Sequence, residues 1–446
     1  MITSEQTIAA IATATGGAIS VIRISGNQAL EIADRVFSKR NRQTLSQADG
    51  YTVHYGNIEY EGEVIDNALA VVFRAPHSYT GEDSVEFSCH GSKYIAERTI
   101  EALIANGARA ATQGEFTKRA FLNGKMDLSQ AEAVADIIAS DSRAFHQVAM
   151  NQMKGTYSSG INTLREHLVE LAALLELELD FSEEEVEFAD RSRLRNIMQQ
   201  LKSEINSMCL SFRSGNALKE GIPVAIVGAP NVGKSTLLNA LVGEQRAIIS
   251  DIAGTTRDTI EEVLFINGVK FRIIDTAGIR SSEDVIESMG IERSKKAVER
   301  AEIVLIVCDG NDVEIPEDLS LEQKRVIVVF NKRDINTEPV SSYQGEYALI
   351  SAKENQGIDE LRELLCKPYQ DVCNQAVTVT NARHYEVLQR SETELDEAHR
   401  ALDMGLSADL VVEHIRVIIN NLGEITGKIT SDEILGSIFA KFCIGK

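Results

Sequence analysis

The sequence predicts three regions of different fold class: an α+β region at the N-terminus, an all-α helical region, and an α/β region inserted into the helical one. The first 120 or so residues mix β-like runs with turns and helices. Apolar residues recur at helical spacing after Lys125 and again after Pro368. Between them, short apolar runs alternate with helical stretches, as in a parallel sheet with crossover helices. The expected domains are 1–120, 121–218 together with 372–446, and 219–371.

The N-terminal region carries β-like runs beside turn residues. The run AISVIRI at 18–24 is followed by Ser25-Gly26, which ends the expected strand. Further strands are expected at Ala68–Phe73 and Ser84–Cys89, and a helix at Lys93–Asn106 that Gly107 ends. This mixture indicates an α+β fold.

The helical region lies on both sides of the insertion. A capping box at Thr430–Glu433 precedes the last helix. Neither flank alone makes a large core, so we interpret both as one interrupted domain, which compact domains tolerate because their termini often lie close together. The expected helices are Leu128–Met150, Ile161–Leu179, Leu194–Phe212, Ala382–Leu402, Asp409–Leu422 and Asp432–Phe442.

The inserted region contains five short apolar runs that read as strands of a mainly parallel sheet. Asn267-Gly268 stands between two β runs within Glu262–Asp275, which is a strong hairpin signal and makes one strand antiparallel. The five expected strands are Pro223–Val227, Phe271–Ile274, Ile303–Val307, Val326–Phe330 and Ala348–Ile350.

Composition and charge limit the function classes. No run of about 18 apolar residues exists, and the N-terminus shows no secretory pattern, so we expect a cytoplasmic protein that does not span a membrane. The 6 scattered cysteines lack metal-ligand spacing and are expected to be reduced thiols. The formal net charge of −22 argues against a stand-alone nucleic-acid binder. If the protein acts on RNA, we expect a basic partner to carry much of the contact.

A phosphate-binding pattern follows the first strand of the inserted region. The stretch Gly228–Ser235 fits GxxxxGK[ST] between a strand and the helix that continues at Thr236. Backbone N–H groups of such a loop, with the helix N-terminus, form a cradle for phosphates. Lys234 is expected to reach the β- and γ-phosphates, and Ser235 to coordinate Mg²⁺.

Three further motifs follow later strands. Asp275-Thr276-Ala277-Gly278 is expected near Mg²⁺ and the γ-phosphate. In Asn331-Lys332-Arg333-Asp334, the carboxylate can accept hydrogen bonds from the N1–H and 2-amino groups of guanine, which adenine lacks. Ser351-Ala352-Lys353 supports the base. This order resembles the translation-factor-related, Ras-like GTPases and favours GTP over the alternative of a P-loop ATPase.

The GTPase motifs do not by themselves identify the residues that carry out hydrolysis. Ile279 stands where Ras-like enzymes carry a Gln that orients water, so another polar group is needed. The nearby carboxylates are Glu283, Asp284 and Glu287, and spacing alone does not choose among them. In Gly254–Asp258, Thr256 can reach Mg²⁺, while Arg257 is either an arginine finger or, preferably, part of a switch salt bridge.

A monovalent cation is a further hypothesis. Asn231 in the phosphate loop is a neutral oxygen ligand close to the phosphates, and the stretch 250–255 could offer carbonyl oxygens. Neutral oxygens suit K⁺, which could replace an arginine finger.

Four features occur together in this chain: the inserted GTPase block, GTTRD at 254–258, Ile279 after DTAG, and the terminal Cys443-Ile444-Gly445-Lys446. Together they resemble the MnmE (TrmE) family of tRNA-modifying GTPases. The N-terminal stretches that agree are Arg23–Gly26, Thr80–Asp83, His90-Gly91 and Gly114–Asn123.

The resemblance implies a homodimer that works with the flavoprotein MnmG as a heterotetramer. Together they would install an aminomethyl or carboxymethylaminomethyl group on carbon 5 of the wobble uridine (position 34) of certain tRNAs, with tRNA bound mainly through the partner. It also implies 5-formyl-tetrahydrofolate or a related tetrahydrofolate in the N-terminal domain, with Cys443 beside it in an open role. The implied folate contacts are Arg23, Glu86, Lys125 and Lys446.

For the GTPase, the resemblance implies K⁺-dependent dimerisation of G domains and selects Glu287 as the water-orienting group. Glu287, Lys234 and Thr256 are the expected catalytic residues, and Ser235 and Thr256 the Mg²⁺ ligands. The implied K⁺ ligands are Asn231, Ser250, Ile252 and Thr255. The expected GTP-binding residues are Asn231, Val232, Gly233, Lys234, Ser235, Thr236, Ser250, Thr255, Thr256, Asp275, Thr276, Ala277, Gly278, Asn331, Lys332, Asp334, Ser351, Ala352 and Lys353.

Two alternatives share these motifs. A ribosome-assembly GTPase would need neither the folate-like positions nor the C-x-G-K tail, and usually carries a basic RNA-binding module. A folate-dependent one-carbon transferase with the GTPase as regulator predicts activity that survives Lys234→Ala, whereas a GTP-driven modification enzyme predicts its loss.

Overall fold

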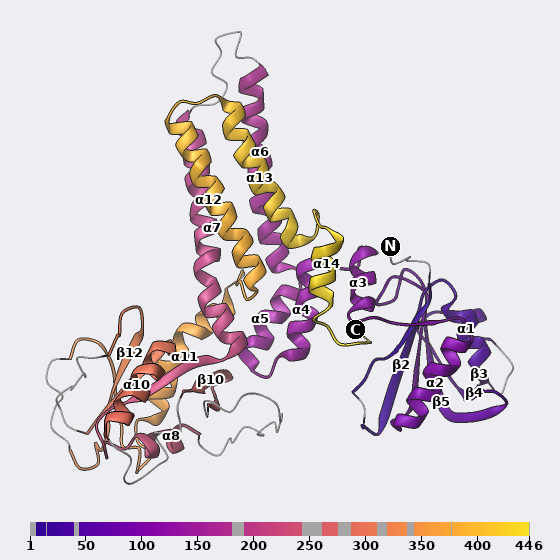
Figure 1. The fold of residues 1–446 in the computed structure, drawn as a ribbon, viewed down its shortest axis with the longest axis horizontal. Helices are drawn as coiled ribbons and strands as arrows, with labels where there is room; N and C mark the ends of the chain where they lie inside the picture. Colours follow the sequence, from indigo (N-terminus) through magenta and orange to yellow (C-terminus); the bar gives the residue numbers. More distant parts are fainter. Residues whose placement is uncertain are drawn as a thin grey trace. The chain divides into compact units, whose positions relative to one another are not determined.

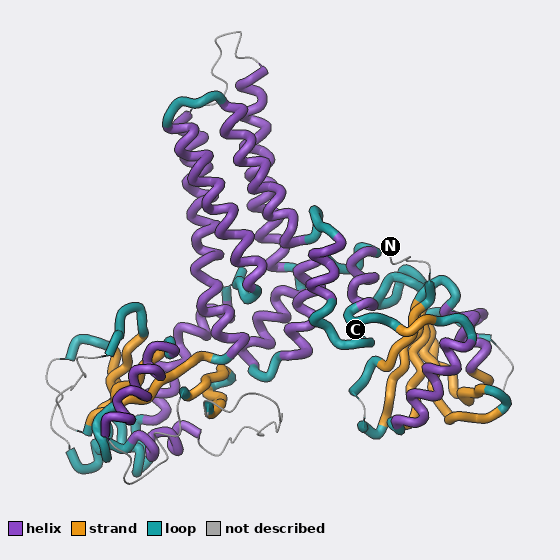
Figure 2. Tube along the Cα trace, viewed as in Figure 1, coloured by secondary structure: helices purple, strands orange, loops and turns teal. Residues whose placement is uncertain are grey.

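The structure is a computed structural model that describes residues 6–14, 16–39, 44–180, 191–242, 261–274, 287–309, 319–336, 343–375 and 377–445. The chain divides into two compact units, Met1–Ala135 with Leu422–Lys446, and Asp136–Asn421. The described strands gather in two sheets (Figure 2). No helix in these ranges is both long and apolar enough to cross a membrane.

The first unit begins with a seven-stranded sheet in the order β3-β4-β5-β6-β2-β1-β7. Its neighbouring strands are antiparallel except β1 and β7, which pair in parallel. The elements up to this point are β1 Ile8–Ile11, β2 Ile19–Ser25, α1 Ala29–Val36, β3 Phe37–Lys39, β4 Thr52–Tyr60, β5 Glu63–Phe73, β6 Ser84–His90, α2 Lys93–Ala105 and β7 Arg109–Ala110.

The side-chain alternation of β2 separates the core from a candidate site. Ile22 and Ile24 are buried in the cluster that the apolar faces of α1 and α2 complete. Arg23 lies between them in the chain and therefore points to the opposite face of the sheet. On the next strand, β6, Glu86 is its direct partner in the antiparallel register.

The C-terminal end belongs to the same unit. The helices here are α3 Glu115–Leu122, the first two turns of α4 Leu128–Ala139, and α14 Asp432–Phe439. Leu128, Leu435 and Phe439 share one buried cluster, so α14 packs on α4. After α14 the tail forms an antiparallel bridge between Ile444 and Gln113, which returns the end of the chain to the N-terminal region.

The helical part of the second unit contains long helices that run side by side (Figure 1). Salt bridges join neighbours: Lys202 on α7 to Asp396 on α12, at 2.5 Å, and Arg416 on α13 to Glu176 on α6, at 2.7 Å. The helices are α5 Arg143–Met153, α6 Thr156–Asp180, α7 Arg191–Glu220, α12 Ala382–Asp403 and α13 Ala408–Thr426.

The inserted α/β region has a six-stranded sheet in the order β13-β12-β11-β8-β10-β9. All described pairs are parallel except β9 with β10. Asn267 and Gly268 have φ of 50° and 81°, so the predicted hairpin turn is confirmed. The elements are β8 Ile222–Val227, α8 Lys234–Val242, β9 Glu262–Ile266, β10 Val269–Ile273, α10 Glu287–Arg300, β11 Ile303–Cys308, β12 Arg325–Phe330, β13 Glu346–Leu349 and α11 Ile358–Asn374.

Besides the strands β1, β3, β4 and β7, which the sequence did not predict, two helix boundaries differ from the sequence-based prediction. The single helix expected at Leu128–Met150 is two helices, because Ser142 leaves the helical conformation and its side chain caps α5 by accepting a hydrogen bond from the Phe145 N–H. The N-cap of α14 is Ser431, whose side chain accepts from the Ile434 N–H, so the box placed at Thr430 was one residue early.

Candidate functional site

The loop between β8 and α8 has the backbone shape that its glycines allow. Gly228 and Gly233 have φ of 152° and 99°, values that side chains rarely tolerate. A Cβ at Gly233 would lie 2.3 Å from the Asn331 Nδ2, and one at Gly228 would lie 2.3 Å from the Val307 carbonyl oxygen. The loop therefore approaches other parts of the site more closely than any other residue type permits, and it leads into the N-terminus of α8, where anions are favoured.

Lys234 is the first residue of α8 and lies over this loop. Its Nζ donates to the carbonyl oxygens of Gly228 and Ala229, both at 2.8 Å. Burial lowers the pKa of the Lys234 ammonium. The next two residues, Ser235 and Thr236, are exposed in the first turn of α8. A hydroxyl beside a lysine at a helix N-terminus has the chemistry that suits a Mg²⁺–phosphate group.

Asn331 connects the phosphate loop to the base-binding segment. It follows β12 and is 4% exposed. Its Nδ2 donates to the Val232 carbonyl oxygen at 2.8 Å, and its Oδ1 accepts from the Ala352 N–H at 2.9 Å. One buried side chain thus holds together three strand ends that lie far apart in sequence.

Asp334 presents a carboxylate at the same edge. The Ser351 hydroxyl donates to its Oδ1 at 2.7 Å, and this hydrogen bond lowers the pKa of Asp334. Ser351 is fully buried while Asp334 is exposed. The buried hydroxyl therefore orients the carboxylate, and the carboxylate remains accessible to a ligand. Nearby, the Lys332 Nζ lies 2.9 Å from an oxygen of Asp309, and Lys353 is exposed.

Part of the expected nucleotide site lies outside the described residues. Among the expected K⁺ ligands the structure describes Asn231, which is exposed with φ of 62°. The side chain of Glu287, at the start of α10, is also outside them. The other expected site residues outside the described ranges are Ser250, Ile252, Thr255, Thr256, Arg257, Asp275, Thr276, Ala277, Gly278, Glu283, Asp284 and Lys446.

A second group of expected residues meets in the first unit. The Arg23 Nε donates to Glu86 Oε1 at 2.7 Å. The guanidinium carbon of Arg23 lies 5.2 Å from the ring centroid of Tyr79 and 5.5 Å from that of Phe116. These are cation–π distances, so both rings and the Glu86 carboxylate fix the orientation of Arg23.

Lys125 touches the same segment of chain as Arg23. Its Nζ donates to the Pro76 carbonyl oxygen at 2.9 Å, and Tyr79 stands three residues further on. The Tyr79 hydroxyl is 2.8 Å from the Thr117 Oγ1. Lys125 is exposed, and the Arg23–Glu86 pair is half-buried. The group therefore offers two cations and one carboxylate, and this combination suits a ligand that has carboxylates and a polar ring system.

An ion-pair network that sequence reasoning missed holds this segment. Arg119, 5% exposed, lies 3.1 Å from both Glu82 and Glu115, and Arg109 lies 2.6 Å from Glu115. Burial alone would raise the pKa of Glu115, but hydrogen bonds from Arg109, the Thr112 N–H and Arg119 outweigh it and lower the pKa to about 2. Glu82, Glu115 and Arg119 lie in the stretches 80–83 and 114–123, whose sequence agrees with the MnmE family but does not reveal that they pair.

The C-terminal tail lies against residues that precede Phe116. The Gly114 N–H donates to the Cys443 carbonyl oxygen at 3.4 Å, and Cys443 itself is exposed. Gly445 has φ of 94°, and a Cβ there would lie 2.1 Å from the Ile11 carbonyl oxygen. This close approach to β1 requires glycine at the third position of the C-x-G-K tail.

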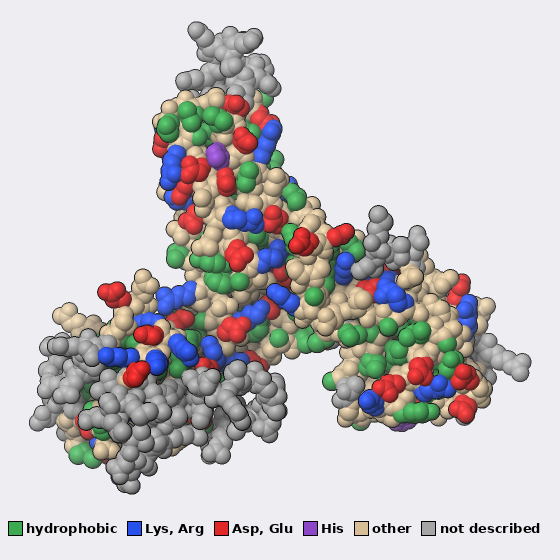
Figure 3. Space-filling model, in the orientation of Figure 1, with side chains coloured by type: hydrophobic (Ala, Val, Ile, Leu, Met, Phe, Trp, Pro, Cys, Tyr) green, Lys and Arg blue, Asp and Glu red, His purple; other side chains and the backbone are tan. Residues whose placement is uncertain are grey.

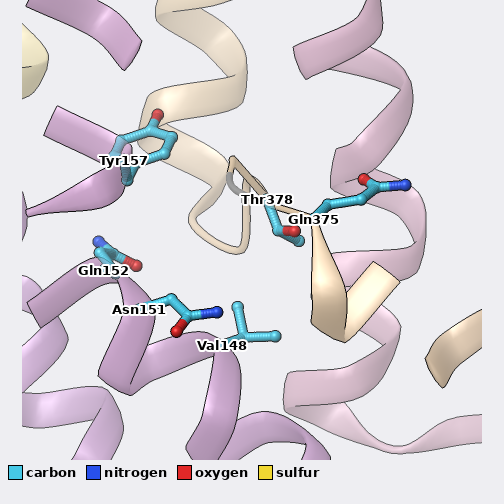
Figure 4. Close-up of a pocket in the computed structure, with 6 residues that line it drawn as sticks. All are labelled: Val148, Asn151, Gln152, Tyr157, Gln375 and Thr378. Atoms are coloured by element: carbon cyan, nitrogen blue, oxygen red, sulfur yellow. The ribbon is translucent and has the colours of Figure 1, made fainter. Parts of the chain in front are cut away.

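A cavity where the chain leaves the α/β region is no ligand site. It lies between side chains of α5, α6 and the segment after α11 (Figure 4). Its space suits about one water molecule. Its lining residues are Val148, Asn151, Gln152, Tyr157, Gln375 and Thr378.

A phosphate loop before α8, tied through Asn331 to an oriented carboxylate and to Ser351–Lys353, defines a P-loop GTPase. Residues 7–125 match the family described as GTP-binding protein TrmE N-terminus, and residues 128–443 match the one described as MnmE helical domain. The chain belongs to the MnmE family of tRNA modification GTPases, and it is a GTP hydrolase.

Its relatives are similar over their full length. The tRNA modification GTPase MnmE of Christiangramia forsetii is 46% identical over 471 residues, covering 99% of both chains. That of Bacteroides thetaiotaomicron is 48% identical over 467 residues, covering 99% of this chain and 100% of its own. The predicted family and the predicted combination of TrmE-type N-terminal, helical and G domains are therefore confirmed. The exact domain boundaries stay a prediction.

Proposed function

We propose that this chain couples GTP hydrolysis to tRNA modification. With a flavoprotein of the MnmG kind, it would act on carbon 5 of the wobble uridine of certain tRNAs to form aminomethyl or carboxymethylaminomethyl groups. The observation that carries the proposal is full-length kinship with tRNA modification GTPases, combined with a buried Asn331 that holds phosphate and base segments together.

The proposed roles in hydrolysis follow from the site. Lys234 would exchange its carbonyl partners for the β- and γ-phosphates, and Asp334 would accept from guanine. Ser235, with Thr256, would hold Mg²⁺, whose charge stabilises the phosphates when it is bound. Glu287 would orient the attacking water. Asp275–Gly278 would face Mg²⁺ and the γ-phosphate.

Potassium is proposed to activate hydrolysis by pairing two G domains across their nucleotides. Asn231, Ser250, Ile252 and Thr255 would supply neutral oxygens to the ion. What supports this is the exposure of Asn231 on the phosphate loop, where its amide can meet a bound ion. A monovalent cation at this place would supply positive charge near the phosphates without an arginine.

In the N-terminal domain, Arg23, Glu86, Lys125 and Lys446 are proposed to bind 5-formyl-tetrahydrofolate or a related tetrahydrofolate, with Cys443 nearby. The hydrogen bond between Gly114 and Cys443, with Gly114 two residues before Phe116, supports a site to which the C-terminal tail and Arg23 both contribute. The pair of cations suits the glutamate carboxylates of a folate.

The proposed assembly is a homodimer that joins MnmG as a heterotetramer in the cytoplasm. On the face shown in Figure 3, the described Lys and Arg side chains are interspersed with Asp and Glu and form no broad basic patch. With a net charge of −22, the chain gains little from phosphate contacts, so the partner is proposed to hold most of the tRNA.

Nucleoside mass spectrometry of tRNA tests the modification claim. We expect cells lacking the gene to lose the modified wobble uridines, the wild-type gene to restore them, and Lys234→Ala to restore none. Unchanged uridines in the deletion would remove the claim. Restoration by Lys234→Ala would instead favour a one-carbon transferase that the GTPase merely regulates.

A GTPase assay in matched KCl and NaCl tests the potassium claim separately. We expect faster hydrolysis in KCl for the wild type and a smaller difference for Asn231→Ala, with nucleotide affinity as the control. Equal rates in the two salts would refute the role of K⁺ while leaving GTP binding intact.

A further inference from the structure

The β9–β10 hairpin joins two stretches expected to respond to the nucleotide. β9 begins at Glu262, just after the GTTRD stretch 254–258, and β10 ends at Ile273, just before Asp275. In GTPases the stretches at these two places are ordered by the γ-phosphate and its Mg²⁺ and released on hydrolysis. Because the hairpin is covalently joined to both stretches, a change in their order is expected to act on its position.

The turn of this hairpin completes the N-terminus of α5. The first N–H groups of a helix have no partner inside it. Here the Phe145 N–H is capped by Ser142, and the Ala144 N–H donates to the Gly268 carbonyl oxygen at 2.9 Å. Gly268 has φ of 81°, and a Cβ there would lie 2.9 Å from the Arg143 Cβ, so turn and helix are in direct contact.

An ion pair lies beside this contact. The Lys270 Nζ, on β10, is 2.6 Å from the Asp141 Oδ2, in the segment just before α5. The Lys270 side chain is 17% exposed and that of Asp141 is 47% exposed. Two residues along β10, the Arg272 Nε donates to the carbonyl oxygen of Gly221, the residue that joins α7 to β8.

Apolar packing runs through the same place. A single buried cluster contains Ile266 and Val269 of the hairpin together with Ala144 and Val148 of α5. Because such cores are packed as densely as crystals, a shift of the hairpin displaces the helix or opens a cavity, which is costly. The hairpin and the start of α5 therefore have to move together.

We propose that the Gly268–Ala144 hydrogen bond and the Lys270–Asp141 ion pair form the joint through which α5 of the helical domain senses the nucleotide bound to the G domain. Asp141 and Lys270 are positioning residues in this scheme, since they act through the hairpin and not on the nucleotide. The proposal rests on the GTP site described above. It adds the contacts through which a conformational change at that site would reach the helical domain.

Hydrogen–deuterium exchange on the full-length protein tests this joint. Amide exchange in α5, residues 143–153, is compared between samples saturated with GDP and with a non-hydrolysable GTP analogue. The variants are Asp141→Asn, Lys270→Met and the charge exchange Asp141→Lys with Lys270→Asp. Glu292→Gln is the matched control, because it breaks an exposed pair with Lys296 on α10, at 3.1 Å, that lies within the same G domain. Affinity for a fluorescent GDP is measured on every sample.

The wild type and Glu292→Gln are expected to show a nucleotide-dependent change in α5 exchange. Each single variant is expected to reduce that change at least about twofold, with GDP affinity unaltered, and the charge exchange to restore it. An α5 that exchanges equally in both states, or single variants that keep the wild-type change, would overturn the proposal. Loss of GDP binding in the wild type would instead contradict the GTP site itself.

Discussion

Asn331 uses both ends of its side-chain amide on backbone groups and so links the phosphate segment to the base segment. A shorter or charged side chain at this position would leave the Val232 carbonyl or the Ala352 N–H buried without a partner. At the scale of residues, the site is therefore determined by a few polar side chains and by the two glycines that leave room for them.

Asp334→Asn is expected to weaken GDP binding by roughly tenfold or more, because an amide cannot accept both guanine donors and hydrogen bonds to a charged acceptor are among the stronger ones. Xanthosine diphosphate, which presents an oxygen in place of the 2-amino group, is expected to gain affinity for this variant. Fluorescent-nucleotide titrations measure both. Equal GDP affinity for the wild type and Asp334→Asn would contradict the assigned role.

Gly233→Ala is expected to abolish nucleotide binding, because its Cβ would lie 2.3 Å from the Asn331 Nδ2 in a backbone conformation with positive φ. Gly62→Ala is the control: it has φ of 83° but open space around the added carbon, so it carries only the backbone strain, about 1 kcal/mol. A Gly233→Ala protein that binds GDP normally would show that the close approach is not needed.

At the scale of elements, the helix α14 leads into the C-terminal tail, which contacts β1. The stability of the first turn of α14 is expected to depend on its N-cap, Ser431. Ser431→Ala is expected to lower local stability by about 1 kcal/mol, while Thr430→Ala, one residue earlier, is expected to have little effect. Amide exchange in 432–439 reports this locally. Equal exchange in both variants would argue that the cap contributes nothing.

The network around Glu115 predicts a pH dependence. Its pKa in the folded protein, about 2, lies below the ordinary value of 4.5, so its contribution to stability is present above about pH 4.5 and is lost as pH falls toward 2. Glu115→Gln is therefore expected to be less stable than the wild type near neutral pH, with the gap closing in acid. Urea unfolding followed by circular dichroism measures this, with Glu97→Gln, in an exposed pair, as control. A gap that stays constant from about pH 7 to pH 3 would contradict the assignment.

Sequence patterns predicted the elements that contain a clear run of buried residues or a characteristic turn sequence. β8 and β11 of the inserted sheet are nearly continuous apolar runs buried on both faces, and Asn267-Gly268 is a sequence typical of a hairpin turn. β4 was not predicted although its Thr, Val, Ile and Tyr residues favour a strand, because polar residues and Gly56 interrupt its apolar run. Its pairing with β5, a contact between segments, supplies what the local sequence lacks.

The candidate sites also contain parts that the sequence predicts and parts that only the fold reveals. The phosphate loop and Asn331–Asp334 are contiguous motifs whose chemistry is local, so residue patterns find them. The packing of Tyr79 and Phe116 on Arg23, and the ion pair of Arg119 with Glu82, join residues separated by tens of positions. Only the fold brings these together, which is why the sequence did not predict them.

At the scale of the whole molecule, the excess of 67 acidic over 45 basic residues governs contact with polyanions. We expect the isolated protein to bind tRNA weakly, with an affinity that falls as salt rises, since the few phosphate contacts it makes depend on counterion release. Filter binding across a salt series, with and without the flavoprotein partner, measures this. Tight stoichiometric binding by the chain alone at physiological salt would contradict the proposed division of labour.

Guanine selectivity at Asp334, in the segment after β12, is the property on which GTP-driven work by this protein depends. Isothermal titration of the full-length protein with GDP and with ADP, in the same Mg²⁺ buffer, measures it directly. We predict binding of GDP and an affinity for ADP lower by at least about a hundredfold, because adenine would leave the Asp334 carboxylate without donors. Comparable heats and affinities for the two nucleotides would contradict the account.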